Sequence, residues 1–128
     1  MKALLDTHSF LWFILDDSKL SESARSLIEN PDNEVVVSPA TYWEIAIKIR
    51  LGKYTLPATY QGFIESQILA NDFQVLPIEP KHTALLTTMP FHHKDPFDRL
   101  LVAQAISEEI PLISIDEKLD PYGVRRLW

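Results

Sequence analysis

Short apolar runs alternate with longer amphipathic stretches along this chain, and the pattern predicts strands separated by helices. The predicted strands cover residues 2–6, 34–38, 73–78 and 111–116, with 124–128 as a possible edge strand. Two of these runs, around Val36 and Ile113, are continuous rather than alternating in hydropathy. Continuous runs favour strands that are covered on both faces, as in a parallel sheet between helices. We therefore expect an α/β fold.

Helix start signals lie between the predicted strands. Ser21 is placed to cap a helix over residues 22–29. Three further helices begin with a capping residue followed by proline, at Ser38-Pro39, Glu79-Pro80 and Asp95-Pro96. Residues 8–15 and 59–70 complete the predicted helices, and Gly52 is placed to end the helix that begins at Pro39.

Length and composition limit the class of protein. A chain of 128 residues has the length of one domain, so we expect residues 1–128 to form a single domain. A composition of 46% hydrophobic and 23% charged residues excludes intrinsic disorder. The absence of cysteine excludes thiolate zinc sites, iron–sulfur clusters and cysteine nucleophiles, and leaves oxygen and nitrogen ligands.

The charge balance argues against one mode of nucleic-acid binding. With 12 Lys and Arg against 18 Asp and Glu, the net charge is −6, so bulk positive charge cannot hold a polyanion. No segment reaches the ~18 apolar residues of a membrane span. Asp6 and His8 interrupt the first apolar run before the core of a signal peptide is complete. We expect a soluble, cytoplasmic protein that does not contact a membrane.

Four acidic residues fall where the predicted strands give way to helices. Asp6 and Asp116 end predicted strands, Glu44 lies in the second turn of a helix, and Asp98 lies in the first turn of another. In an open parallel sheet, ligands bind beyond the carboxyl ends of the strands, where the following helices begin. We therefore expect the four carboxylates to converge there.

Each acid also has a structural interpretation. Asp6, Asp95 and Asp116 are suited to cap a helix or end a turn, and Asp98 is favoured by the dipole of the helix that starts at Pro96. Glu44 differs, because its helix is apolar on almost every side and is therefore expected to be buried. A buried carboxylate needs a partner or a metal ion, and Lys48, four residues on, offers an ion pair.

A carboxylate cluster without closely spaced His or Cys suits Mg²⁺ or Mn²⁺ better than zinc. One or two such ions activate water and stabilise the attacking and leaving oxygens of a phosphodiester, so hydrolysis of phosphodiesters is the expected chemistry. The four His residues lack metal-binding spacing, and we expect surface or supporting roles for them. Five basic residues have either a solvated position or a role in holding an RNA backbone: Lys48, Arg50, Lys53, Lys94 and Arg99.

Taken in order, these segments resemble PIN-domain proteins, in particular the VapC-type ribonuclease toxins of prokaryotic toxin–antitoxin pairs. The matching segments cover most of the chain: residues 4–8 with Leu11-Trp12, residues 38–48 with Gly52-Lys53, residues 93–105, and residues 113–116.

The resemblance implies a PIN-like three-layer sandwich, with a central parallel sheet flanked by helices. It implies that Asp6, Glu44, Asp98 and Asp116 are catalytic and bind metal, with Asp95 as an auxiliary acid. Ser114 stands where such proteins often have Thr. The implied activity is that of a toxin endoribonuclease that uses Mg²⁺, for which Mn²⁺ can substitute. The implied partners are RNA, a cognate antitoxin and a second copy of the chain in a homodimer.

Three other classes of protein share some of these features. A haloacid-dehalogenase-like phosphatase needs a second Asp two residues after Asp6, where this chain has His8. A receiver domain needs Lys after a late strand, where this chain has Asp116. The third is a catalytically silent PIN-like interaction module with structural acids, whose partner surface would comprise Leu11, Trp12 and Phe13.

Overall fold

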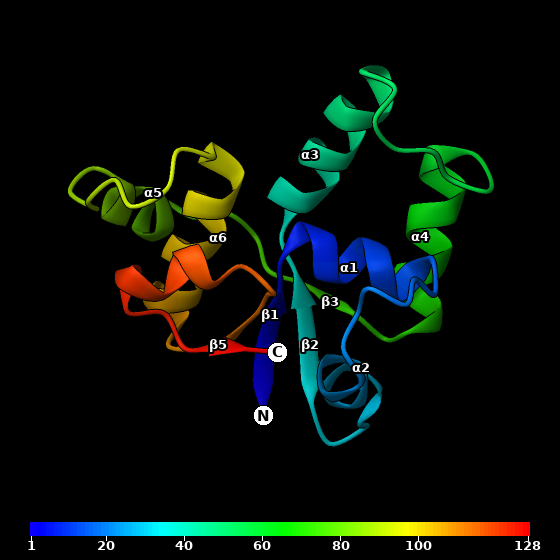
Figure 1. Ribbon diagram of the computed structural model, residues 1–128, viewed down its shortest axis with the longest axis horizontal. Coiled ribbons are helices and arrows are strands. Elements are labelled where there is room, and N and C mark those ends of the chain that lie inside the picture. The colour runs from blue at the N-terminus through cyan, green and yellow to red at the C-terminus, as the bar shows by residue number, and fades with distance from the viewer.

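A five-stranded sheet lies between two groups of helices in the computed structural model, which describes residues 1–128 (Figure 1). The strand order is β3-β2-β1-β4-β5, and every pairing is parallel. The strands are β1 (Lys2–Leu5), β2 (Glu34–Val37), β3 (Gln74–Val75), β4 (Leu112–Ile113) and β5 (Arg126–Leu127). The predicted α/β sandwich around a parallel sheet is therefore confirmed.

Six α-helices and one 3₁₀ helix connect the strands. They are α1 (Thr7–Ile14), α2 (Glu22–Glu29), α3 (Pro39–Arg50), α4 (Tyr60–Ala70), α5 (Pro80–Leu86), α6 (Pro96–Glu108) and the 3₁₀ helix η1 (Glu117–Tyr122). Ser21, Ser38 and Asp95 cap their helices through their side chains, as predicted. Gly52 follows the last residues of α3 with φ of 75°, the left-handed conformation that glycine adopts most readily. None of the helices has the length and hydropathy that crossing a bilayer requires.

Successive strand residues face opposite helical layers. On β1, Ala3 and Leu5 pack in a core built with α1, α2 and α4, whereas Leu4 packs in a second core built with α6 and η1. Figure 1 shows these two groups of helices on opposite sides of the sheet. Because both faces of the central strands are covered, their sequences are continuously apolar.

The order of the strands places a crevice beside β1. The chain runs from β1 outward through β2 to β3, and then returns to the other side of β1 as β4. Such a reversal is a topological switch point, where ligands bind at the carboxyl ends of the strands. Asp6 directly follows β1, and Asp116 follows β4 after Ser114 and Ile115.

One face of α3 departs from the expectation of complete burial. Ala40, Thr41, Glu44 and Ile45 are buried, but Trp43 is 64% exposed. The buried residues lie in the half that meets α1 and α6, and the other half extends beyond the sheet (Figure 1). The expectation is correct for Glu44 and wrong for the outer face of the helix.

Three further details differ from the sequence-based expectations. The strands β3 and β4 are shorter than predicted, and β3 ends before Pro77, which has no N–H to continue the ladder. The helix η1 was not predicted, because its six residues are too few for a helical hydrophobic period and include Pro121. Leu11 is buried in the core, so it cannot belong to the partner surface that the interaction-module alternative names, whereas Trp12 and Phe13 are only partly buried against the same core.

Candidate metal centre

The pKa of Asp98 depends on the charges of the four other acids that the sequence singles out. Burial raises the pKa of Asp98 to about 8, and the negative charges of Asp95, Asp6, Glu44 and Asp116 contribute to the rise. Charges act on one another in this way only over short distances, since salt screens more distant pairs. The five carboxyl groups therefore gather at the carboxyl end of the sheet.

The tightest part of this group is formed by Asp98, Asp116 and His93. One potential ligand atom of each lies within 4.8 Å of the others. His93 Nε2 is 3.1 Å from Asp116 Oδ2 and 3.5 Å from Asp98 Oδ2. Asp6, Glu44 and Asp95 are not members of this tight group.

His93 acts on the acids as a hydrogen-bond donor. Its Nδ1 accepts the backbone N–H of Asp95 at 3.1 Å, so the proton of the neutral ring lies on Nε2 and points to Asp116. In this tautomer Nε2 cannot bind a metal ion, and His93 instead orients a carboxylate. This tautomer is compatible with the supporting role expected for the histidines. Its proximity to Asp116 was missed, because the two residues are distant in sequence.

Glu44 has the environment expected of a metal ligand. Its side chain is only 3% exposed, and Lys48 Nζ donates to its Oε2 at 2.6 Å. The other oxygen, Oε1, is buried without a hydrogen-bond partner. The predicted ion pair is therefore present but leaves half of the carboxylate unsatisfied. Leaving a buried polar atom unpaired costs about 1–3 kcal/mol, and a bound cation removes that cost.

The remaining three acids have the capping roles that the sequence suggested. Asp6 Oδ1 accepts the N–H of Ser9 at 2.8 Å. Asp95 Oδ1 accepts the N–H groups at the start of α6, and Asp116 Oδ1 accepts the N–H of Lys118. In Asp6 and Asp95 the cap engages Oδ1 alone, so capping leaves the second oxygen for another task.

Asp6 lies deepest among these three and is only 3% exposed. Burial raises the pKa of Asp6, while hydrogen bonds from Ser114 and Ser9 oppose the rise. Ser114 is fully buried, and its hydroxyl also accepts the N–H of Asp116. This serine therefore links the two acids that follow β1 and β4.

The basic residues around the site divide into two groups. Arg99 is only 7% exposed and donates to the carbonyls of Met89 and Pro90 and to the hydroxyl of Tyr122, so neither a solvated position nor a contact with RNA is correct for it. Lys48 forms an ion pair with Glu44. Arg50, Lys53 and Lys94 form no ion pair and are exposed.

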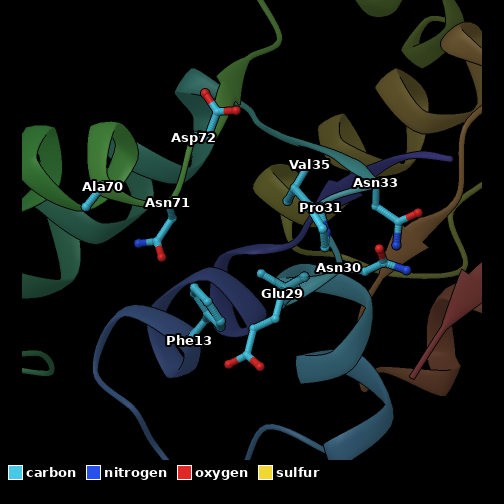
Figure 2. A pocket seen from close by; sticks show the side chains of 10 residues that line it. Phe13, Glu29, Asn30, Pro31, Asn33, Val35, Ala70, Asn71 and Asp72 are labelled. Carbon is cyan, nitrogen blue, oxygen red and sulfur yellow. The ribbon is translucent and has the colours of Figure 1, made fainter.

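Two other features lie outside this centre. His82 is buried between α5 and α6, where Nδ1 accepts the N–H of Glu79 and Nε2 contacts Glu108, so both ring nitrogens have protein partners. A hollow of about 350 Å³ lies beside Phe13, Asn30 and Asn71 (Figure 2). Its wall includes the turns that precede β2 and β3. The hollow therefore lies at the amino end of these strands, opposite to the end where the five carboxyl groups of the candidate metal centre lie.

Comparison with known proteins gives concordant results. A PIN domain family model matches residues 3–124. The chain is 28% identical over 117 residues to Ribonuclease VapC22 of Mycobacterium tuberculosis, covering 91% of this chain and 88% of that protein.

Solved structures of the same fold cover nearly the whole chain. VapBC2 from Rickettsia felis, bound to a promoter DNA fragment, has a TM-score of 0.72 at 15% identity and covers 99% of this chain and 98% of its own. FitAcB from Neisseria gonorrhoeae has a TM-score of 0.67 at 16% identity and covers 98% and 96%. At these identities the likeness establishes the fold.

Proposed function

The chain belongs to the PIN domain family, and from this premise we propose that it is a metal-dependent endoribonuclease and the toxin of a toxin–antitoxin pair. Similarity to Ribonuclease VapC22 and to VapBC structures supports this function. We further propose that residues 1–128 act as a single PIN domain in the cytoplasm. The proposed partners are RNA, a cognate antitoxin and a second copy of the chain.

The observation that carries the nuclease proposal is the unpaired Oε1 of Glu44, buried beside an acid whose pKa is raised to about 8. Asp6, Glu44, Asp98 and Asp116 are the proposed metal-binding and catalytic residues, with Asp95 as an auxiliary acid that holds the start of α6. Their oxygens are hard ligands, which suit Mg²⁺ and also accept Mn²⁺. When bound, the ion supplies an activated water and neutralises charge on the phosphate.

The chain's own residues orient the acids for this chemistry. Lys48 fixes one oxygen of Glu44, so that the other faces a constant direction. The His93 N–H fixes the carboxylate of Asp116, while the Ser114 hydroxyl accepts the backbone N–H of Asp116 and hydrogen-bonds to Asp6. Fixed carboxylates bind an ion with little further ordering, which favours affinity.

Cleavage of RNA by the purified protein tests the proposal. We expect cleavage with Mg²⁺ or Mn²⁺, arrest by chelator, and loss of activity in Asp6→Asn, Glu44→Gln and Asp98→Asn. The matched control is Asp32→Asn, an exposed acid in the turn before β2 at the opposite edge of the sheet. Full activity in Asp6→Asn or Asp98→Asn would contradict the assignment.

The capping roles of Asp6, Asp95 and Asp116 favour a second candidate, a catalytically silent interaction module with structural acids. In such a protein Mn²⁺ does not raise the melting temperature. In a metalloenzyme the ion stabilises the fold by mass action, and Glu44→Gln removes that stabilisation. A thermal-shift titration of both proteins with Mn²⁺ separates the two candidates.

A further inference from the structure

A second hollow, with a volume of about 480 Å³, adjoins the metal centre and differs in charge from the rest of the surface. Its wall is formed by Phe91, His92, His93, Lys94 and Lys118, and it contains no carboxylate. Four other surface hollows each have at least one acidic residue in the wall. In a chain with a net charge of −6, a wall of aromatic, imidazole and ammonium groups is a local exception.

Both lysines of this hollow are free to bind an anion. Lys94 and Lys118 are exposed, and neither side chain lies within 4.0 Å of a carboxylate. Lys48 and Lys81, by contrast, are each held by a glutamate at 2.6 Å. Two unpaired ammonium groups at one hollow form a site for a phosphate, which they hold as point charges.

Phe91 supplies an aromatic surface at the same place. Its side chain is 82% exposed, although the guanidinium carbon of Arg99 lies 4.0 Å from the ring centroid. The buried arginine therefore covers one face of the ring and leaves the other open to solvent. An open aromatic face stacks with any nucleobase, independently of its sequence.

The segment that carries Phe91 is held firmly by hydrogen bonds. Arg99 donates to the carbonyls of Met89 and Pro90, and the Tyr122 hydroxyl accepts the N–H groups of His92 and His93. An aromatic ring on a fixed backbone loses little conformational freedom when it binds a base.

The hollow is also joined directly to the proposed metal ligands. His93 lies in its wall and donates to Asp116, while the backbone N–H of Lys118 donates to the other oxygen of Asp116. A molecule that occupies the hollow therefore lies next to the carboxylates.

We propose that this hollow binds one nucleotide of single-stranded RNA beside the metal centre, with the base stacked on Phe91 and a phosphate held by Lys94 and Lys118. The inference rests on the nuclease function proposed above and adds the residues that hold the substrate. It also explains how an acidic protein binds a polyanion, since the contact needs only local positive charge.

Fluorescence anisotropy with two labelled probes tests the proposal in EDTA, where no cleavage interferes. The first probe is a single-stranded oligoribonucleotide of about ten nucleotides, and the second has the same backbone with abasic sites in place of the bases. Lys94→Gln and Lys118→Gln are each expected to weaken binding of both probes. Each is also expected to reduce the slope of log affinity against log salt concentration by roughly 0.7 in magnitude. Lys2→Gln, a matched change at the other end of β1, is expected to change neither.

Phe91→Leu keeps an apolar side chain but removes the stacking face. We expect it to weaken the base-bearing probe roughly 5- to 100-fold, to leave the abasic probe unaffected, and to be rescued by Phe91→Trp. Binding equal to wild type in all three variants, with both probes, overturns the proposal. Loss of binding to polyglutamate in the lysine variants, with RNA binding unchanged, also overturns it and identifies an acidic-peptide site.

A parallel cleavage assay with Mn²⁺ separates this proposal from the nuclease function. If the wild-type protein binds RNA through Phe91, Lys94 and Lys118 but does not cleave it, the nuclease function fails and the nucleotide site stands. If it cleaves RNA and the three variants bind and cleave normally, the nucleotide site fails and the nuclease function stands.

Discussion

Lys48 Nζ donates to Glu44 Oε2 at 2.6 Å across one turn of α3, while Glu44 Oε1 is buried without a partner. Burial acts to lower the pKa of Lys48, but the hydrogen bond and charge of Glu44 outweigh it, and the pKa of Lys48 is raised. Lys48 is therefore charged at neutral pH. Lys48 supplies a single positive charge. That charge does not balance the negative charges of Glu44 and of the other acids of the site together.

Replacement of Lys48 by methionine is expected to make the fold more dependent on metal. Lys48→Met removes the charge and retains most of the side-chain length, so Glu44 is left buried without a counter-ion. Because Lys48 is itself partly exposed, we expect a loss of about 1–3 kcal/mol in EDTA, below the usual cost for a fully buried pair. Mn²⁺ is expected to restore more stability in this variant than in wild type.

Thermal unfolding in EDTA and with Mn²⁺ measures both effects. Lys53→Met is the matched control, because Lys53 is exposed and forms no ion pair. The prediction is contradicted if Lys48→Met is as stable as wild type in EDTA, or if its response to Mn²⁺ is unchanged. Either result would show that the ion pair does not stabilise the buried Glu44.

The raised pKa of Asp98 predicts how stability varies with pH in the absence of metal. The pKa of this carboxyl group is about 8 in the folded protein, whereas in the unfolded chain it is near the ordinary value of 3.8. Between these values the folded state holds a proton that the unfolded state releases, so stability falls as pH rises. The slope from this one group is at most about 1.4 kcal/mol per pH unit, and it vanishes above about pH 8.

Asp98→Asn isolates this contribution, because asparagine mimics the neutral carboxyl group. In EDTA we expect the variant to be more stable than wild type at pH 8, with the difference shrinking toward pH 4. Chemical denaturation at several pH values measures it. With Mn²⁺ the order is expected to reverse, since the ion displaces the proton of Asp98 and binds wild type alone. A difference that is constant with pH would contradict the raised pKa.

The sequence predicted the elements whose signals are local. Three capping residues followed by proline located the starts of α3, α5 and α6, and continuous apolar runs indicated a parallel sheet. The position of Asp6 directly after β1 followed from the same pattern, whereas Asp116 lies beyond the end of β4, after Ser114 and Ile115, because β4 is shorter than predicted. The rule for parallel sheets indicated that both acids lie at the carboxyl end of the sheet. The burial of Glu44 was predicted from its apolar neighbours.

The sequence contains no local signal for the tertiary contacts of the site. Arg99 and Lys94 are both basic residues near Asp98 in sequence, yet one is buried against three oxygens and the other is exposed. His93 meets Asp116 across a separation of 23 residues. Which basic residue packs inside, and which histidine meets an acid, depends on how loops fold over the sheet edge, and hydrophobic periodicity does not encode this.

His93→Ala is expected to weaken Mn²⁺ binding without abolishing it. The ring orients Asp116 but does not bind the ion, and loss of such an orienting group costs about 10- to 100-fold in metal affinity. His93→Gln, which retains an N–H donor, is expected to recover part of the affinity. Isothermal titration calorimetry gives the values, with the exposed neighbour His92→Ala as the control. Complete loss of binding in His93→Ala would instead identify His93 as a ligand.

Tyr122→Phe is expected to loosen the segment that carries His93 and Phe91. The Tyr122 hydroxyl accepts hydrogen bonds from the N–H groups of His92 and His93 and from Arg99, at 2.9 to 3.0 Å. Without the hydroxyl, each of these three donors loses the acceptor that it has in the wild-type protein. We therefore expect the free energy of unfolding to fall by about 1–3 kcal/mol. Hydrogen exchange is expected to accelerate in residues 89–93, because their backbone is no longer tied to η1.

Tyr60→Phe is the matched control for this change. The Tyr60 hydroxyl donates a single hydrogen bond, to the carbonyl of Tyr42 at 2.9 Å, and does not contact residues 89–93. We expect it to cost only about 0.5–1.5 kcal/mol and to leave exchange in that segment unchanged. Mn²⁺ affinity should fall in Tyr122→Phe but not in Tyr60→Phe, because only the former displaces His93 from Asp116. Equal effects of the two variants on exchange and affinity would mean that Asp116 is positioned without help from Tyr122.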